Sequence, residues 1–217
     1  MKNEKSTLFL LVILLFPMAS GCNTNDNTEA HGKKDRATFN FSEASQGLPA
    51  QGLWRQGIAV HDMNGDGHLD ILAPPPRKAD EAYPVPIVWY GHGKGAWQES
   101  LLDISGNGVD GYGDIAVADF NQDGTPDMGL AIHAAGLKAF KGTGNGTYAD
   151  FSEGLPGPAD FTSRRLVAAD MNGDGTMDMA AVSEGPFGGG CAAPKGIMVC
   201  YPKETGWTCE PASPEKS

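Results

Sequence analysis

One nine-residue phrase, written three times, constrains this chain more than any other feature of its sequence. DMNGDGHLD occupies residues 62–70, and close copies follow as DFNQDGTPD at 119–127 and DMNGDGTMD at 170–178. The copies begin 57 and 51 positions apart. A period of about 50 residues is typical of repeat arrays and propellers, in which each repeat is one supersecondary unit.

Strand-like segments surround each copy of the phrase in the same order. Short apolar runs precede and follow it, and a third run leads into a hairpin that closes at Trp97, Tyr148 or Trp207. That aromatic residue would open a fourth strand, and no helical period is present after the N-terminal segment. We therefore expect an all-β chain of three four-stranded units, with the Asp-rich loop between the first and second strands of each.

The spacing of oxygen donors within the phrase indicates calcium. Calcium takes six to eight oxygens, and side chains at positions one, three, five and nine can supply four of them. The backbone carbonyl at position seven adds another, and the glycine at position six permits the sharp bend. Three carboxylates and one amide favour a hard divalent cation over zinc or copper. The predicted ligands are Asp62, Asn64, Asp66, His68 and Asp70 in the first loop, Asp119, Asn121, Asp123, Thr125 and Asp127 in the second, and Asp170, Asn172, Asp174, Thr176 and Asp178 in the third.

Two other interpretations fit parts of the loop pattern. An EF-hand loop also begins DxNxDG, but it needs an acidic ligand at position twelve and helices on both sides. Ala73, Leu130 and Ala181 occupy position twelve here. Three Asp-rich turns without any metal are the other alternative, and their repeated carboxylates would repel one another without a cation.

The three loops, together with the hairpins YGHGKG and FKGTGNG, resemble the FG-GAP/VCBS repeat, the calcium-loop blade of integrin-α-type β-propellers. The resemblance covers roughly residues 39–209, although the third hairpin, YPKETGW, keeps only one glycine. It implies three four-stranded propeller blades and three structural calcium ions. Because a closed propeller typically has four to eight blades, three imply a partial or open propeller. The chain would then be a fragment of a longer protein, a self-associating chain, or a short open array.

The N-terminus has the features of a targeting segment. Residues 1–21 contain two lysines, an apolar run and small residues ending at Cys22, which resembles a bacterial lipobox with Ala19 in place of the usual leucine. The expectation is a lipoprotein signal peptide at 1–21, a lipidated Cys22 with a flexible tether over 22–38, and a repeat domain over 39–217. The chain would be exported and lipid-anchored to a bacterial membrane, in the periplasm or at the cell surface. An ordinary secretory signal that happens to contain a cysteine is the alternative.

The net charge bears on the class of partner, and the cysteine count bears on disulfide bonding. The net charge of -11 argues against nucleic acid. Beyond Cys22, the cysteines are Cys191, Cys200 and Cys209. One disulfide and one free thiol are expected in an exported protein, and the sequence leaves the pairing open.

The expected function is a non-enzymatic binding or adhesion module for a glycan or a protein, by analogy with the repeat family. Loops on the face opposite the calcium loops would carry the ligand, although they also read as solvated connections. The alternatives are an accessory part of a polysaccharide-degrading enzyme system and a truncated propeller without a ligand of its own. The predicted ligand-face residues are Arg77, Tyr83, Tyr112, Phe161, Arg164 and Arg165.

Overall fold

The computed structural model describes residues 40–52, 54, 57–77, 83–104, 111–185 and 196–212. The predicted signal peptide, Cys22, the tether and Cys191 lie outside these residues. Residues 42–217 form one structural unit. Across its described part the chain has strands and turns but no helix, so none is available to cross a membrane.

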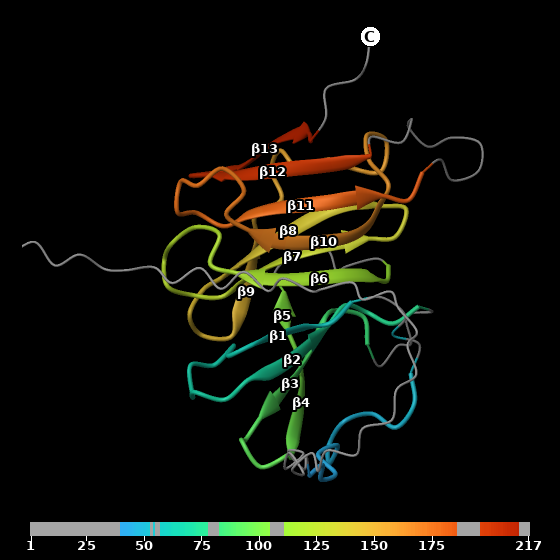
Figure 1. Cartoon of the computed structure of the whole chain (residues 1–217), viewed down its shortest axis with the longest axis vertical. Coiled ribbons are helices and arrows are strands. Elements are labelled where there is room, and N and C mark those ends of the chain that lie inside the picture. Colours follow the sequence, from blue (N-terminus) through green and yellow to red (C-terminus); the bar gives the residue numbers. More distant parts are fainter. Residues whose placement is uncertain are drawn as a thin grey trace, which may run out of the picture. The chain divides into compact units, whose positions relative to one another are not determined.

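The strands form three sheets that follow one another along the chain (Figure 1). The first sheet contains β1 (Ala59–His61), β2 (Asp70–Ala73), β3 (Ile87–Gly91) and β4 (Trp97–Leu101), in that order. The third sheet contains β10 (Ser163–Ala169), β11 (Asp178–Ser183), β12 (Ile197–Lys203) and β13 (Gly206–Pro211). Each is an antiparallel meander, which confirms the expected strand order.

The second sheet differs from the expectation because it has five strands. Its order is β5 (Asp103–Ile104), β9 (Thr147–Asp150), β8 (Gly136–Gly142), β7 (Asp127–Ile132) and β6 (Gly113–Ala118). β5 follows β4 of the first sheet and pairs in parallel with β9. It covers the outer edge of β9, where unpaired backbone groups would otherwise face solvent.

The outer hairpins of the first and third sheets are covered by a repeated segment instead. The backbone N–H of Trp97 donates to the carbonyl of Gln46, and the N–H of Trp207 donates to that of Glu153, each at 2.8 Å. The next residue in each covering segment is a glycine with positive φ, Gly47 at 95° and Gly154 at 83°. A Cβ at either position would lie about 2 Å from a tryptophan carbonyl oxygen, so glycine permits this close approach.

The second sheet lies between two apolar clusters because its strand residues alternate between its faces. Larger side chains such as Met128, Leu130 and Phe140 pack with Leu72 and Val88 of the first sheet. The other face carries small residues that pack with the third sheet. They are Ala116, Ala118, Ala131 and Ala139.

The outer faces of the first and third sheets, which point away from the second sheet, differ in how far they are covered. The far face of the first sheet is covered around Ile87 and Trp89, against which Trp54 and Tyr83 pack, and Val60 at its edge strand is exposed. The far face of the third sheet is open, with Val167 56% exposed, Val182 40% and Ile197 49%. The described strands therefore form three open sheets, with the outer face of the first sheet partly covered and the outer face of the third sheet open.

The structure settles the cysteine pairing that the sequence left open. Cys200 and Cys209 are directly opposite each other in the β12–β13 pair and form a disulfide. Cys200 is fully buried in the cluster between the second and third sheets. The bond thus joins β12 to β13 at the core side of the third sheet.

Candidate metal centres and a neighbouring pocket

Each Asp-rich loop joins the first two strands of its sheet, as the sequence predicts. Residues 62–70 connect β1 to β2, residues 119–127 connect β6 to β7, and residues 170–178 connect β10 to β11. The final Asp of each phrase is the first residue of the second strand. The three loops therefore occupy the same position in the three repeats.

The first Asp of each loop is surrounded by backbone N–H groups. Oδ1 of Asp62 accepts hydrogen bonds from the N–H groups of Gly65 at 2.8 Å and Asp66 at 3.2 Å, and Oδ2 accepts one from Gly67 at 2.9 Å. Asp170 accepts the equivalent three bonds, and Asp119 accepts two of them. The loop backbone thus folds around one carboxylate.

The third and fifth residues interlock in every loop. In the first loop Asn64 Nδ2 donates to Asp66 Oδ2 at 3.0 Å, and the Asp66 N–H donates back to Asn64 Oδ1 at 3.0 Å. The N–H of His68 bonds to Asp66 Oδ1 and lowers the pKa of that carboxyl. The N–H of Thr176 lowers the pKa of Asp174 in the same way. These exposed carboxylates are therefore ionised at neutral pH, as a calcium ligand must be.

The second loop has a side chain where the other two have glycine. Gln122 has φ 59°, whereas Gly65 and Gly173 occupy the same position at 72° and 77°. A left-handed conformation is uncommon for a residue other than glycine. The Gln122 amide donates to the Gly175 carbonyl at 3.1 Å and to Thr176 Oγ1 at 2.8 Å. The strained residue thereby ties the second loop to the third.

The ninth residue of each loop is a buried aspartate that holds the loop to the sheet. Asp70 is fully buried; Oδ2 accepts the N–H of Met63 and Oδ1 accepts the N–H of Gly91, both at 2.8 Å. Asp127 repeats this arrangement with Phe120 at 2.9 Å and Gly142 at 2.8 Å. The carboxylate therefore connects the start of the loop to the end of the third strand.

The third loop lacks one of these bonds. Asp178 is fully buried, and its Oδ2 accepts the N–H of Met171 at 2.9 Å, but its Oδ1 has no hydrogen-bond partner. The position of Gly91 and Gly142 is occupied here by Pro202, which has no N–H. One buried carboxylate oxygen is therefore left unpaired, and such a group is costly unless a water or cation binds it.

Asp127 predicts a pH dependence for the metal-free protein. Burial raises its pKa from 3.8 to about 6, against the lowering effect of the Gly142 and Phe120 N–H groups. Because the folded chain holds this proton more tightly than the unfolded chain, the free energy of unfolding falls as pH rises from about 4 to about 6. This one group contributes up to about 3 kcal/mol to that fall. Urea unfolding in EDTA across this range measures it, and Asp127→Asn should flatten the curve; parallel curves for the two proteins contradict the prediction.

As they lie, the loop side chains do not converge on a single point. Among the described residues, no three His, Cys, Asp or Glu side chains are grouped so that they could hold a metal ion. The carboxylates are instead directed at loop N–H groups. Each carboxylate oxygen has further lone pairs, so these bonds leave acceptor capacity for a cation. The donor set fits calcium in its chemistry, and metal binding by these loops stays a prediction.

The predicted ligand-face residues separate into four environments. Arg77 lies over the ring of Tyr112 at 5.7 Å, Tyr112 contacts the His133 ring at 4.6 Å, and Arg164 bonds to Glu184 at 3.1 Å. His133 also contacts Glu184, which links these residues into one cluster. The sequence offered no sign of His133 or Glu184 in this role.

The other predicted ligand-face residues lie apart from that cluster. Tyr83 packs edge-on against Trp54, with ring centroids 5.4 Å apart, at the covered face of the first sheet. Arg165 is exposed on β10, paired with Val182. Phe161 is only 1% exposed and belongs to the cluster between the second and third sheets. Its side chain therefore packs the core and is not part of a ligand-binding surface.

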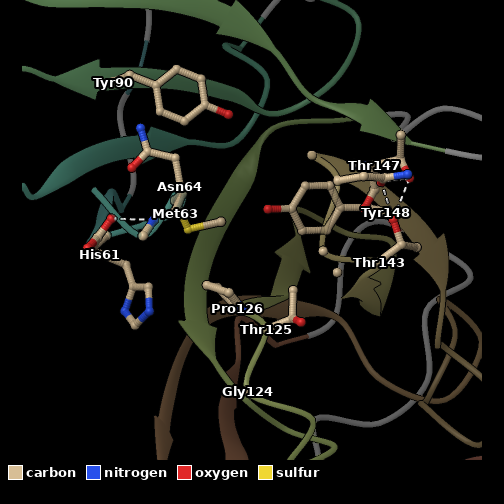
Figure 2. Close-up of a pocket in the computed structure, with 16 residues that line it drawn as sticks. His61, Met63, Asn64, Tyr90, Gly124, Thr125, Pro126, Thr143, Thr147 and Tyr148 are labelled. Carbon is tan, nitrogen blue, oxygen red and sulfur yellow. Dashed lines mark hydrogen bonds between the residues drawn. The ribbon is translucent and has the colours of Figure 1, made fainter. Parts of the chain in front are cut away.

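A pocket of about 710 Å³ lies on the side of the metal loops, where the sequence predicted calcium but no glycan or protein ligand. Figure 2 shows its walls, which come from the first loop, β3, the end of the second loop and the β8–β9 hairpin. Sequence reasoning missed it because these segments are far apart in the chain and meet only through the packing of the first two sheets.

Comparison with known proteins gave no assignment: no family model and no curated protein matches this chain.

Proposed function

We propose that the chain is a calcium-binding, non-enzymatic binding module of the FG-GAP/VCBS type, in which calcium stabilises the fold. The observation that carries the proposal is the shared hydrogen-bond arrangement of three exposed loops. In each, carboxylates at positions one and five are held by the loop's own amides, and the aspartate at position nine is buried. Such preformed concentrations of negative charge are stabilised by a hard cation.

Calcium would be held by the side chains at positions one, three, five and nine and the carbonyl at position seven of each loop. The two positive charges of the bound ion offset two of the three negative charges of its loop. The ion binds the folded chain only, because pairing of the first two strands of a sheet brings the two ends of the loop together. Its proposed role is structural.

Calcium titration of the metal-free protein tests this proposal directly. Isothermal titration calorimetry should give three ions per chain, and Asp62→Asn, Asp119→Asn or Asp170→Asn should each remove one. An unchanged stoichiometry in all three variants would show that calcium binds somewhere else, and no binding would overturn the proposal.

The unpaired oxygen of Asp178 predicts a specific effect of Pro202→Ala. Alanine restores a backbone N–H at this position, and proline already has a Cβ, so the side chain fits. In the natural chain, calcium would pair with Asp178 Oδ1 and remove the cost of an unpaired buried oxygen. In the variant this oxygen already accepts the new N–H, so calcium removes no such cost. The stabilisation gained on adding calcium should therefore be smaller in Pro202→Ala by about 1–3 kcal/mol.

Comparing the calcium-induced gain, and not the stability itself, removes the effect of proline on the unfolded chain, because that effect is present in both conditions. Pro158→Ala, in an exposed turn, is the matched control and should leave the gain unchanged. Equal gains in all three proteins would show that calcium does not reach Asp178 Oδ1.

Self-association of the proposed blades follows from the open face of the third sheet. By register, Val167, Val182 and Ile197 correspond to Ala116, Ala131 and Leu137, which are buried between the second and third sheets. An apolar face of this kind favours packing against another sheet, and we propose that a second copy of the chain supplies it. Light scattering should detect a dimer that Val182→Lys abolishes and that Val60→Lys, at a similarly exposed valine of the first sheet, leaves intact.

The export route and the anchor are proposed from residues 1–22. The lipidated Cys22 would attach the module to a bacterial membrane, so Cys22→Ser should move the protein from the membrane fraction to the soluble fraction. The ligand of the module is proposed to be a glycan or a protein.

A further inference from the structure

The pocket beside the first metal loop combines aromatic and polar walls in a way that suggests a ligand. Its volume of about 710 Å³ lies in the usual range for small-molecule sites. Met63 and the ring of Tyr90, both partly buried, contribute apolar surface, and the buried Tyr148 lies at the pocket's edge. Figure 2 shows the two tyrosines on opposite sides, with their hydroxyl groups directed toward the space between them.

Both tyrosines present neutral hydroxyl groups. Tyr148 is 5% exposed, and burial raises its pKa far above the usual value. Burial also raises the pKa of Tyr90, with a further contribution from the Asp70 carboxylate. A neutral phenol can both donate and accept a hydrogen bond, which suits a ligand that carries hydroxyl groups.

The β8–β9 hairpin supplies a polar wall whose orientation is fixed. Asn145 Oδ1 accepts bonds from the Thr147 N–H at 3.1 Å, Thr147 Oγ1 at 2.7 Å and Thr143 Oγ1 at 2.5 Å. Because a backbone N–H can only donate, the oxygen of this amide must face Thr147 and its Nδ2 must point the other way. Asn145 is exposed, and no bond from Nδ2 is found within the described residues, so two amide hydrogens are available beside the pocket.

The charges around the pocket limit the class of ligand. No lysine or arginine lines it, whereas Asp62 does. With calcium bound the first loop still carries a net charge of -1, because Asp62, Asp66 and Asp70 bring three negative charges against the two positive charges of the ion. Phosphate, sulfate and carboxylate groups would therefore be repelled, and an anionic ligand is disfavoured. An uncharged molecule with many hydroxyl groups and some apolar C–H surface would suit both the polar groups and the apolar side chains of the walls.

We propose that this pocket binds a neutral saccharide, with the sugar against the ring of Tyr90 and hydrogen-bonded by the hydroxyl groups of Tyr90 and Tyr148 and by Asn145 Nδ2. The inference rests on the proposed function as a binding module and names its ligand class. It also moves the ligand site to the metal-loop side of the sheets. Since Asp62 and Asn64 line the pocket and are proposed ligands of the first calcium, saccharide and calcium would each change the affinity for the other by the same factor.

The test is an NMR titration of the purified protein in calcium. Cellobiose, maltose, lactose and glucose serve as neutral probes. Glucuronic acid, which differs from glucose by a carboxylate, is the anionic control. At least one neutral probe should shift the signals of Tyr90, Tyr148 and Asn145 saturably, and glucuronic acid should bind more weakly than glucose. Tyr148→Phe and Asn145→Ala each remove hydrogen-bonding groups at the pocket and should weaken binding about tenfold.

Tyr90→Phe and Tyr201→Phe form a matched pair, because Tyr201 occupies the position of Tyr90 in the third repeat and lies outside the pocket. Tyr90→Phe should weaken binding and Tyr201→Phe should not. The inference is overturned if no neutral probe shifts these signals, if glucuronic acid binds as well as glucose, or if the two variants behave alike.

Failure of this inference can be distinguished from failure of the proposed calcium function. A thermal melt of the same sample, with and without calcium, reports the metal loops alone. If calcium raises the melting temperature but no saccharide shifts the NMR signals, the saccharide proposal is rejected and the proposed calcium sites stand. If a saccharide shifts the NMR signals but calcium leaves the melting temperature unchanged, the calcium proposal is rejected and the saccharide site stands.

Discussion

Adding millimolar calcium to the metal-free protein, residues 23–217, should raise its melting temperature by at least about 10 °C. An ion that binds only the folded chain stabilises it by about 4 kcal/mol when its concentration is a thousand times its Kd. For a chain of this length each kcal/mol corresponds to about 2–4 °C, so one well-occupied site is sufficient for this shift and three sites would exceed it. Calorimetry or circular dichroism in EDTA, before and after calcium, measures it.

The controls separate site binding from a general effect of divalent cations on an acidic protein. Magnesium at the same concentration should give a much smaller shift, since it demands octahedral geometry and gives up water reluctantly. Asp119→Asn should reduce the calcium shift, whereas Asp160→Asn, at an exposed aspartate outside the loops, should not. Equal shifts with calcium and magnesium, or no shift with either, would contradict the proposed sites.

The strands and loops could be predicted because their signals are local and repeated. β3 and β12 begin at Ile87 and Ile197, where the apolar runs begin, and β4 begins at Trp97, the aromatic that closes its hairpin. In these segments the alternation of side chains and the hairpin glycines already specify the backbone. The loop positions follow from the same repeat.

The features that sequence reasoning missed depend on packing between distant segments. β5 is two residues long and pairs with a strand more than forty positions away, so no local pattern marks it. Phe161 follows a turn and looks like a surface aromatic until the third sheet covers it. The effect of Pro202 on Asp178 requires the register of β11 against β12.

The second residue of each loop shows how closely the proposed metal sites are joined to the core. Met63, Phe120 and Met171 all donate their backbone N–H to the buried aspartate at position nine. Their side chains differ in environment, since Phe120 is 1% exposed and Met171 is 43% exposed. The nonapeptide alone does not predict which of these side chains is buried. Phe120 is buried because the third sheet packs against it, whereas Met171 belongs to the third sheet's own loop and is exposed.

Phe120→Ala should therefore lower the free energy of unfolding by about 3–5 kcal/mol. The phenyl ring fills the space between the second and third sheets and packs edge-on against Trp207, with ring centroids 5.1 Å apart. Met171→Ala changes the same loop position at a solvent-exposed side chain and should cost less than about 1 kcal/mol. Urea unfolding of both variants in EDTA and in calcium measures the difference; similar losses in the two variants would mean that the second loop is not anchored through Phe120. If the loops bind calcium as proposed, calcium should restore part of the stability of Phe120→Ala, because the ion favours the folded chain whatever the source of the loss.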